Sequence, residues 1–508
     1  MEGRITVFYL LYNMKFPDNL FGRELYIKDD QKETANKVNR NFILLNKNDT
    51  VDLGTYFNSF SPQKWSHYTT LVLLRVIITV NKKSFITVYG GNYKDSEVIV
   101  EKHIDSVNNT IDFLLEKISK YRVLGIKITA LENDTIISNV KYEGEFKNYS
   151  IKKIGIGICT FHRENYLSAN ILVLKKFIDG HSNFRISISD NGNSISTYVT
   201  EHIGIYKNKN YGGSGGFTRT IIEEMYDDTR DYIILMDDDI KIDITTLERL
   251  NAFLAGLKPD FSEFIISGSM LQLDKPNYQV EHTAFLAKIF LHSIGRCDVS
   301  SFKNLVANEG DIKANYLNRY SGWWFSCLPV QCIKKYGLPL PLFIKGDDIE
   351  YSWRFGSKII TLNGIGVWHE KFSSKRNIVM DYFADRNMLL LQTVAVGTTR
   401  YTFLLSALLR LMRRIFVYRG LGIRMFELSI TDFNKGFKDL IVKASDIKFA
   451  EVRRYSEEAN HGMLISILNC FKNICMGAYN FNKLSNDNRL FIKKYLADKS
   501  FWQDFLSL

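Results

Sequence analysis

The chain has 508 residues, of which 45% are hydrophobic, and its 66 Lys and Arg outnumber 55 Asp and Glu for a formal net charge of +11. This length exceeds one ordinary hydrophobic core and predicts two or three domains, and the apolar content excludes wholesale disorder. The positive charge would suit nucleic acid, an anionic membrane surface or phosphorylated substrates. No zinc knuckle or other nucleic-acid motif accompanies it, so we expect no nucleic-acid partner.

The six cysteines show no Cys-x-x-Cys pair and no regular spacing, which favours reduced thiols in a cytosolic protein. The first residues lack the basic and then apolar pattern of a signal peptide. No apolar run reaches the ~18 residues of a membrane span, and the nearest, Thr402–Leu409, ends at Arg410. We therefore expect a cytoplasmic protein.

Residues 1–150 are predicted to form a β-sandwich. Runs of β-branched and aromatic residues are separated by clusters of Asn, Asp, Gly and Lys, as in sheets of short strands. The runs are Ile5–Tyr12, Thr70–Val80, Ser84–Tyr89, Glu97–His103, Val123–Ala130 and Thr135–Tyr142. We interpret this region as a packing or oligomerisation module, with carbohydrate binding as the alternative.

Residues 151–384 are predicted to form an α/β domain of the Rossmann-like, doubly wound type, because strand and helix patterns alternate and motifs follow the strand ends. The predicted elements are strands Ile154–Cys159, Phe184–Ser189 and Ile203–Tyr206 and helices Leu167–Ile178 and Thr220–Tyr226.

Residues 385–508 are predicted to be a helical C-terminal region, since their apolar residues recur at helical spacing. The periodic segments are Met388–Val396, Thr402–Val417, Met463–Cys475 and Leu490–Leu496. Phe403–Arg419 is basic and amphipathic. It would either pack on the main domain with its Arg face in solvent or lie on a membrane surface.

The central motif is Tyr232–Asp243, in which a buried apolar strand ends in Asp237, Asp238 and Asp239. Side chains alternate along an extended segment, so Asp237 and Asp239 point the same way and Asp238 the other. Such carboxylates suit Mg²⁺ or Mn²⁺, which take oxygen ligands. A solvated acidic turn is the alternative.

Three further motifs are weaker individually. The glycine loop Gly212–Gly216 would let backbone N–H groups approach an anion or a sugar, although a flexible connection would also explain it. The paired rings of Trp323 and Trp324 would stack on sugars or belong to the core. The third is an acidic segment before a predicted helix Tyr351–Phe355, where helix capping is the alternative.

A histidine follows a predicted strand, Ile359–Val367, which has a glycine bend. His369 would complete an Asp/Asp/His metal site, and a structural histidine is the alternative.

Together these motifs resemble those of family 2 glycosyltransferases with the GT-A fold, and most closely the galactofuranosyltransferases that build galactan. In that subfamily a β-sandwich precedes the GT-A domain and helices follow it. The matching segments are Thr160–Arg163, Asp190–Gly192, Gly212–Gly216, Asp237–Asp239, Trp323–Trp324, Phe343–Glu350, Trp368–Glu370 and Tyr382–Asn387. The subfamily often has an aromatic residue where this chain has Gly346, which leaves the acceptor linkage open.

The resemblance implies a role for each matching residue. Asp237, Asp239 and His369 would hold Mn²⁺ or Mg²⁺, and Asp348 would be the general base. The acceptor would contact Trp323, Trp324, Asp347 and Glu350. The donor would contact Thr160, Arg163, Asp190, Gly213, Gly215, Gly216, Asp237 and Asp238.

The implied function is an inverting transfer of galactofuranose from UDP-galactofuranose to a glycan or lipid-linked glycan, at the inner face of the cell membrane. Another UDP-sugar donor, such as galactopyranose or glucose, is one alternative. A non-catalytic carbohydrate-binding or assembly protein is another, and a nucleotidyltransferase would leave the late acidic and Trp-His motifs unexplained. A homo-oligomer is expected from family precedent.

Overall fold

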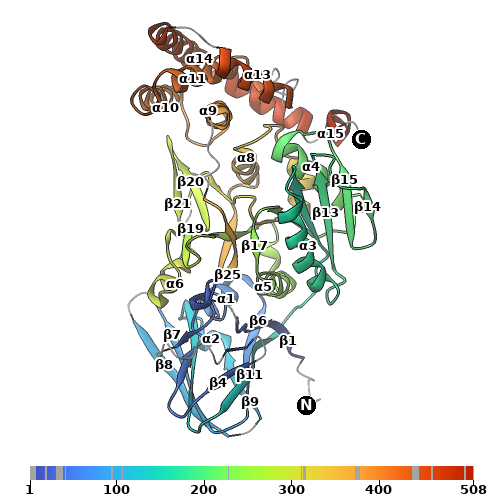
Figure 1. The fold of residues 1–508 in the computed structure, drawn as a ribbon, viewed down its shortest axis with the longest axis vertical. Helices are drawn as coiled ribbons and strands as arrows, with labels where there is room; N and C mark the ends of the chain where they lie inside the picture. Colours follow the sequence, from blue (N-terminus) through green and yellow to red (C-terminus); the bar gives the residue numbers. More distant parts are fainter. Residues whose placement is uncertain are drawn as a thin grey trace.

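The computed structural model describes residues 7–506 apart from gaps at 18–19, 30–37, 40–41, 93–94, 106, 227, 311, 313–315, 372–377, 438–445, 459–461 and 497–498. In Figure 1 an antiparallel β-sandwich lies at the bottom, a mixed α/β sheet with its helices lies in the middle, and a layer of helices lies at the top. This order agrees with the predicted fold class.

The sandwich consists of two antiparallel sheets. One contains β3 (Val38–Asn39), β4 (Phe42–Leu45), β11 (Thr135–Phe146), β6 (Leu71–Val80) and β9 (Asn108–Leu114), with β1 (Tyr9–Asn13) also paired to β11. The other contains β2 (Lys28–Asp29), β5 (Thr50–Asp52), β10 (Val123–Ala130), β7 (Ser84–Gly91) and β8 (Ser96–Ile104). Residues of β9 alternate between exposed and buried, as expected when one face of a sheet packs on a core.

Five of the predicted N-terminal runs coincide with strands to within a few residues. The sixth, Ile5–Tyr12, is strand only from Tyr9, and Ile5 and Thr6 lie outside the described residues. The short strands β4 and β5 and the strand β9 were not predicted. Polar residues interrupt the apolar patterns of β5 and β9, and β4 has only four residues, so pairing with a neighbouring strand defines all three.

The large sheet has four parallel strands in the order β15 (Ile203–Lys207), β13 (Phe184–Asp190), β12 (Ile154–Thr160) and β16 (Tyr232–Asp237). Next to β16 lie β24 (Ser326–Pro329), antiparallel, then β18 (Ile265–Gln272) and its parallel partner β25 (Ile359–His369). Short strands complete it: β14 (Tyr198–Val199), β17 (Lys241–Ile242), β19 (Tyr278–Glu281) and β22 (Cys297–Asp298). The carboxyl ends of the parallel strands share one edge, where open α/β sheets bind ligands.

The helices around this sheet are α3 (Glu164–Ile178), α4 (Gly212–Glu224), α5 (Ile244–Ala255), α6 (Phe302–Asn308), α7 (Val330–Tyr336) and α8 (Asp347–Arg354). A small sheet of β21 (Phe290–Ile294), β20 (Thr283–Ala287) and β23 (Arg319–Tyr320) lies beside them. Two predicted helix starts are wrong. The glycine motif is not a loop before a helix but the first turn of α4, and the acidic motif is the first turn of α8.

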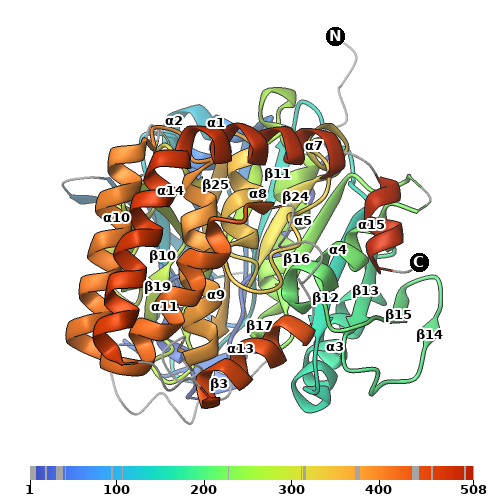
Figure 2. The same ribbon diagram turned by 90° about the horizontal axis from the view of Figure 1, so that it is seen from above.

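The C-terminal layer consists of α9 (Ile378–Gln392), α10 (Arg400–Arg413), α11 (Arg419–Phe433), α13 (Asp446–Glu458), α14 (Met463–Phe491) and α15 (Lys499–Leu506). Figure 2 shows α9, α10, α11 and α14 side by side. Helix α9 crosses the boundary predicted after residue 384. Among the described helices, none combines the length and the apolar content that a membrane crossing requires.

The arginines predicted to form a solvated face on Phe403–Arg419 partly point inward. Arg410 pairs with Asp385 at 2.8 Å, and the buried Arg414 pairs with Asp381 at 2.8 Å and with Asp385 at 2.6 Å. The expectation of a fully solvated face is therefore wrong, because the carboxylates of α9 compensate these charges. The helix also ends at Arg413, where a π-helical turn, Arg414–Tyr418, follows it.

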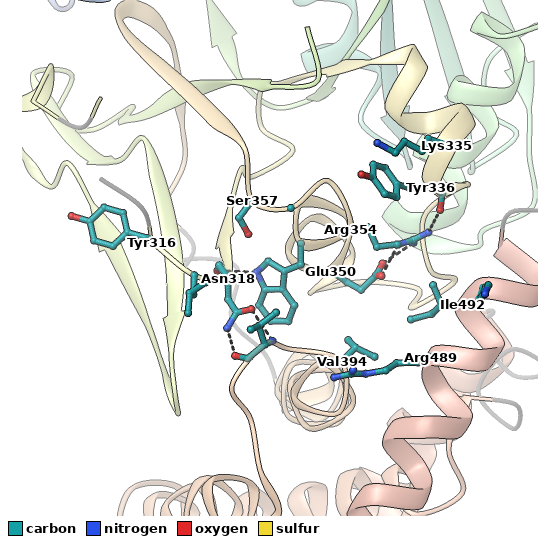
Figure 3. A pocket seen from close by; sticks show the side chains of 15 residues that line it. Tyr316, Asn318, Lys335, Tyr336, Glu350, Arg354, Ser357, Val394, Arg489 and Ile492 are labelled. Carbon is teal, nitrogen blue, oxygen red and sulfur yellow. Dashed lines mark hydrogen bonds and ion pairs between the residues drawn. The ribbon is translucent and has the colours of Figure 1, made fainter. Parts of the chain in front are cut away.

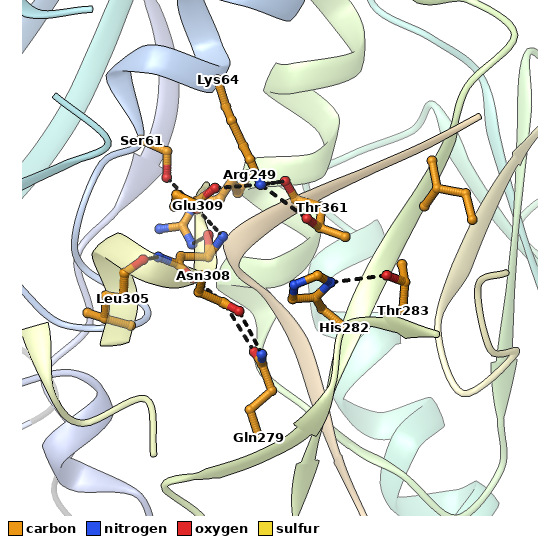
Figure 4. Close-up of polar contacts among 12 residues, drawn as sticks. Ser61, Lys64, Arg249, Gln279, His282, Thr283, Leu305, Asn308, Glu309 and Thr361 are labelled. Carbon is orange, nitrogen blue, oxygen red and sulfur yellow. Dashed lines mark hydrogen bonds and ion pairs between the residues drawn. The ribbon is translucent and has the colours of Figure 1, made fainter. Parts of the chain in front are cut away.

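A buried polar network joins the sandwich to the large sheet (Figure 4). Lys64, from α1 (Pro62–Tyr68), pairs with Glu309 at 2.7 Å, and both side chains are 1% exposed. The Lys64 ammonium also donates to the carbonyl and hydroxyl oxygens of Thr361 on β25, at 2.6 and 3.1 Å. Glu309 accepts hydrogen bonds from the Ser61 hydroxyl and from the backbone N–H of Asn363. The sandwich thus holds the middle of β25.

Candidate active site

Two carboxylates and an imidazole meet at the edge of the large sheet. Asp237 ends β16, Asp239 lies in the turn after it, and His369 is the last residue of β25. The His369 Nε2 atom is 3.5 Å from Asp237 Oδ2 and 3.4 Å from Asp239 Oδ1. Neighbouring ligands of one six-coordinate Mg²⁺ or Mn²⁺ are roughly 3 Å apart, so these atoms fit a divalent cation with little movement.

The surroundings of His369 favour its imidazole as a metal ligand. Its Nδ1 atom lies 2.5 Å from the Glu370 carbonyl oxygen, to which it can donate, so that Nε2 is the ring nitrogen that faces the two carboxylates. Burial lowers the pKa of His369, but hydrogen bonds to Asp237 and Asp239 and their charges outweigh it and raise the pKa to about 9. The same attraction that favours a proton here would favour a metal cation.

Asp238, in the turn after β16, does not join this group. It accepts hydrogen bonds from the Thr160 hydroxyl at 2.8 Å and from Arg163 Nη1 at 3.2 Å, and burial raises its pKa to about 6. The same Arg163 nitrogen donates to Asp239 at 2.8 Å. Asn170 of α3 holds the Asp238 backbone carbonyl at 2.8 Å. Thr160 and Arg163 therefore support the acidic turn directly.

Asp190 is fully buried at the end of β13. Its carboxylate accepts hydrogen bonds from the backbone N–H groups of Gly192 at 3.0 Å and Ile195 at 2.7 Å. In this structure it closes its own turn, and its contact with a donor stays a prediction.

The glycines of α4 allow the chain to approach its neighbours closely. Gly212 has a φ of +68°, and a Cβ there would lie 2.1 Å from the Phe343 carbonyl oxygen. A Cβ at Gly216 would lie 2.1 Å from Cys159 Sγ, and one at Gly215 would lie 2.3 Å from the Tyr211 Cβ. Gly213 is more open, and its nearest neighbour would be an Asp347 carboxylate oxygen at 3.6 Å. Close packing thus explains most of the motif, and Gly213 faces the acidic end of α8.

Asp347 and Asp348 begin α8 on the side of the metal-ligand group. Burial, together with the nearby charge of Asp237, raises the pKa of Asp347. Burial and the charge of Asp347 raise the pKa of Asp348. Two carboxylates this close disfavour ionising both, which is the arrangement that prepares one of them to take a proton.

Glu350 is turned to another side of α8. It is 1% exposed, and its carboxylate pairs with Arg354 at 2.6 Å. It lines a cavity of about 520 Å³ together with Arg354 and, from α14 and the π turn after it, Arg489 and Ile492 (Figure 3). Neither Asp347 nor Asp348 lines this cavity, so the structure separates Glu350 from the other acidic residues of the motif.

Trp323 and Trp324 are each only 5% exposed. Trp324 donates from Nε1 to the Gly268 carbonyl at 2.8 Å, and Trp323 packs edge-on against Phe217. Both rings belong to the core here, which was the alternative interpretation of the motif, and stacking on an acceptor sugar stays a prediction.

Comparison with known proteins agrees with the motif resemblance. Residues 15–143 match the family model described as Galactofuranosyltransferase 2 N-terminal. The chain is 25% identical over 413 residues to galactofuranosyltransferase GlfT2 of Mycobacterium tuberculosis, covering 72% of this chain and 62% of that protein. For GlfT2 of Mycolicibacterium smegmatis the identity is 27% over 415 residues, covering 72% and 61%. The chain is similar to galactofuranosyltransferases. It matches less than two thirds of the length of these relatives.

Among solved structures, S. aureus TarS 1-349 in complex with UDP has a TM-score of 0.38 and 11% identity, covering 66% of this chain and 91% of that chain. The mannosyltransferase PcManGT from Pyrobaculum calidifontis, in complex with GDP-Man and Mn²⁺, has a TM-score of 0.31 and 8% identity, covering 70% and 88%.

One acidic residue near Asp348 was not predicted from the sequence. Glu281, the last residue of β19, is 7% exposed, and its charge contributes to the raised pKa of Asp348. Burial also raises the pKa of Glu281, and the Ser293 hydroxyl donates to its carboxylate. No motif surrounds it in the sequence, and its place in the sheet follows from the antiparallel pairing of β19 with β18.

Proposed function

We propose that this chain is an inverting, metal-dependent glycosyltransferase that moves galactofuranose from UDP-galactofuranose to a hydroxyl of a growing surface glycan. In this proposal residues 151–384 form the catalytic domain, between a β-sandwich module of residues 1–150 and a helical region of residues 385–508. The observation that carries it is the meeting of Asp237, Asp239 and His369, together with the similarity to galactofuranosyltransferases.

The metal-ligand group would hold Mn²⁺ or Mg²⁺. A bound divalent cation stabilises the negative charge that develops on a leaving diphosphate. Asp237 is the most exposed of the three ligands, with 35% of its side chain exposed against 3% for Asp239 and His369. Arg163, whose side chain is 41% exposed, lies beside the same carboxylates and would contact the donor with Thr160, Asp190 and Asp238. Gly213, Gly215 and Gly216 would line the binding site of the UDP-sugar donor.

Asp348 would act as the general base. An acceptor hydroxyl is a poor nucleophile, and a carboxylate that removes its proton during attack typically gives ~10²–10⁴-fold in rate. The raised pKa of Asp348 makes it a better base than an exposed carboxylate. With no residue assigned as a covalent nucleophile, transfer is a single displacement and inverts the anomeric centre. Asp347, Glu350 and the tryptophan pair are the proposed acceptor contacts.

The helical region offers a surface for association with the inner face of the cell membrane, where a lipid-linked acceptor would be met. Exposed apolar side chains lie on α10 and on the first half of α14, which pack against each other, and exposed Arg413 and Lys472 add positive charge. The apolar residues include Tyr401, Leu405, Leu464, Leu468 and Phe471. A second copy of the chain is the other candidate. Sedimentation with anionic vesicles and light scattering without them distinguish the two.

The test is to incubate the protein with Mn²⁺ and a panel of UDP-sugars and to read product masses on candidate acceptors. We expect transfer from UDP-galactofuranose. Transfer from UDP-galactose or UDP-glucose instead would assign the same machinery to a pyranose donor. A chain that shows neither transfer nor Mn²⁺-dependent UDP binding would instead be a carbohydrate-binding or assembly protein on this fold.

A further inference from the structure

The loop that leads into α8 has an unusual backbone. Phe343 and Lys345 have φ values of +73° and +68°, and Gly346 follows with +90°. Non-glycine residues adopt positive φ infrequently, and a bulky side chain such as Phe rarely does so without neighbours that hold it. The loop ends at Asp347, so its conformation determines where the two aspartates of α8 lie.

Helix α9 holds this loop through one side chain amide. Asn387 Nδ2 donates to the carbonyl oxygens of Ile344 at 2.8 Å, Lys345 at 2.7 Å and Leu342 at 3.2 Å. Arg386 completes the arrangement, since its Nη2 donates to the Leu342 carbonyl at 2.9 Å and its Nε donates to Asn387 Oδ1 at 2.8 Å. Asn387 and Arg386 are each 1% exposed. A buried amide directed at three carbonyls within four residues of the loop is a specific clamp on the loop conformation.

Helix α4 holds the same loop from the other side. The backbone N–H of Phe343 donates to the Ser214 hydroxyl at 2.8 Å, and the Ser214 N–H donates to the Phe343 carbonyl at 3.2 Å. Ser214 is fully buried. The glycine turn of α4, proposed as a donor contact, therefore touches the backbone that carries the proposed base.

We propose that Asn387 is a positioning residue for Asp348. Its amide, with the Ser214 hydroxyl opposite, fixes the left-handed loop so that the carboxylate of Asp348 stays where an acceptor hydroxyl can reach it. The inference rests on the proposed function of Asp348 as the base, and it gives the Tyr382–Asn387 motif a role: the helical region completes the active site from outside the α/β domain.

The test compares Asn387→Ala with Asn434→Ala in the full chain. Asn387→Ala should lower kcat by about 10²-fold, the effect of misplacing a catalytic group by ~1 Å. Mn²⁺-dependent UDP affinity and the KM for the UDP-sugar should stay within about twofold, because Asp237, Asp239 and His369 lie at or just after the ends of β16 and β25, outside this loop. Asn434 is the control, since its amide also donates to the backbone, although to a single carbonyl, that of Asn473 at 3.0 Å, between α11 and α14. Asn434→Ala should leave kcat unchanged.

Ser214→Ala provides a second variant if Asn387→Ala folds poorly. It should lower kcat in the same way, and the double variant should lose less than the product of the two single effects, because both side chains hold one loop. Wild-type kcat in both single variants, or equal losses of UDP affinity and kcat, would overturn the positioning role. A wild-type chain without any transferase activity would overturn the proposed function itself.

Discussion

The buried pair between Lys64 and Glu309 allows a sharp stability prediction. Both side chains are 1% exposed, and the ammonium contacts Glu309 at 2.7 Å and the two oxygens of Thr361 at 2.6 and 3.1 Å. Lys64→Met removes the cation and leaves the Glu309 carboxylate buried with two hydrogen bonds but without its counter-charge. Breaking one side of such a pair costs about 3–5 kcal/mol. We therefore expect the variant to unfold at markedly lower urea concentration than the wild type.

The consequence should reach the proposed metal site. Lys64 and Glu309 hold Thr361 and Asn363 in the middle of β25, whose end is His369. Calorimetric titration of Mn²⁺ should show weaker binding to Lys64→Met at temperatures where the variant is still folded.

Two control variants isolate the effect of burial. Lys120 pairs with Glu97 at 2.8 Å on the same sandwich, but those side chains are 62% and 52% exposed, so Lys120→Met should leave the unfolding midpoint nearly unchanged. The double variant Lys64→Met with Glu309→Gln should recover much of the lost stability, because no unpaired charge remains. A Lys64→Met protein as stable as the wild type would refute the reasoning.

Further predictions concern the site. Asp348→Ala should abolish transfer and keep Mn²⁺-dependent UDP binding, measured by calorimetry; wild-type-like turnover would remove Asp348 as the base. His369→Ala should lose the Mn²⁺-dependent part of UDP affinity, and unchanged affinity would contradict the metal assignment. Because burial and the charge of Asp347 raise the pKa of Asp348, and only the ionised base is active, kcat/KM should fall as pH falls, through an apparent pKa above the ordinary 3.8; a limb at or below that value would count against this base. Gly216→Ala would place a Cβ 2.1 Å from Cys159 Sγ and should lower the free energy of unfolding by about 1–3 kcal/mol, measured in urea, unless the sulfur moves aside.

Local patterns predicted the regular elements well where one physical signal dominates. Val123–Ala130 is a strand with the predicted bounds, since β-branched residues fill it and turn residues flank it. The predicted start of α4 was wrong because four glycines in five residues have a low helix propensity. Contacts that tolerate no Cβ, such as that of Gly216 with Cys159, fix the turn in spite of that propensity. The inward turn of Arg410 could not be predicted either, since its partner Asp385 lies 25 residues earlier on another helix.

The left-handed loop before α8 also depends on contacts with distant residues, which local sequence patterns do not predict. A positive φ is readable from a sequence mainly where glycine or asparagine permits it, yet here Phe343 and Lys345 adopt it, and glycine appears only at position 346. The conformation is chosen by an amide from α9 and a hydroxyl from α4, both distant along the chain. A side chain that forces its neighbours into an uncommon backbone conformation leaves no local pattern. This is why the Tyr382–Asn387 motif was visible in the sequence and its role emerged only from the three-dimensional contacts.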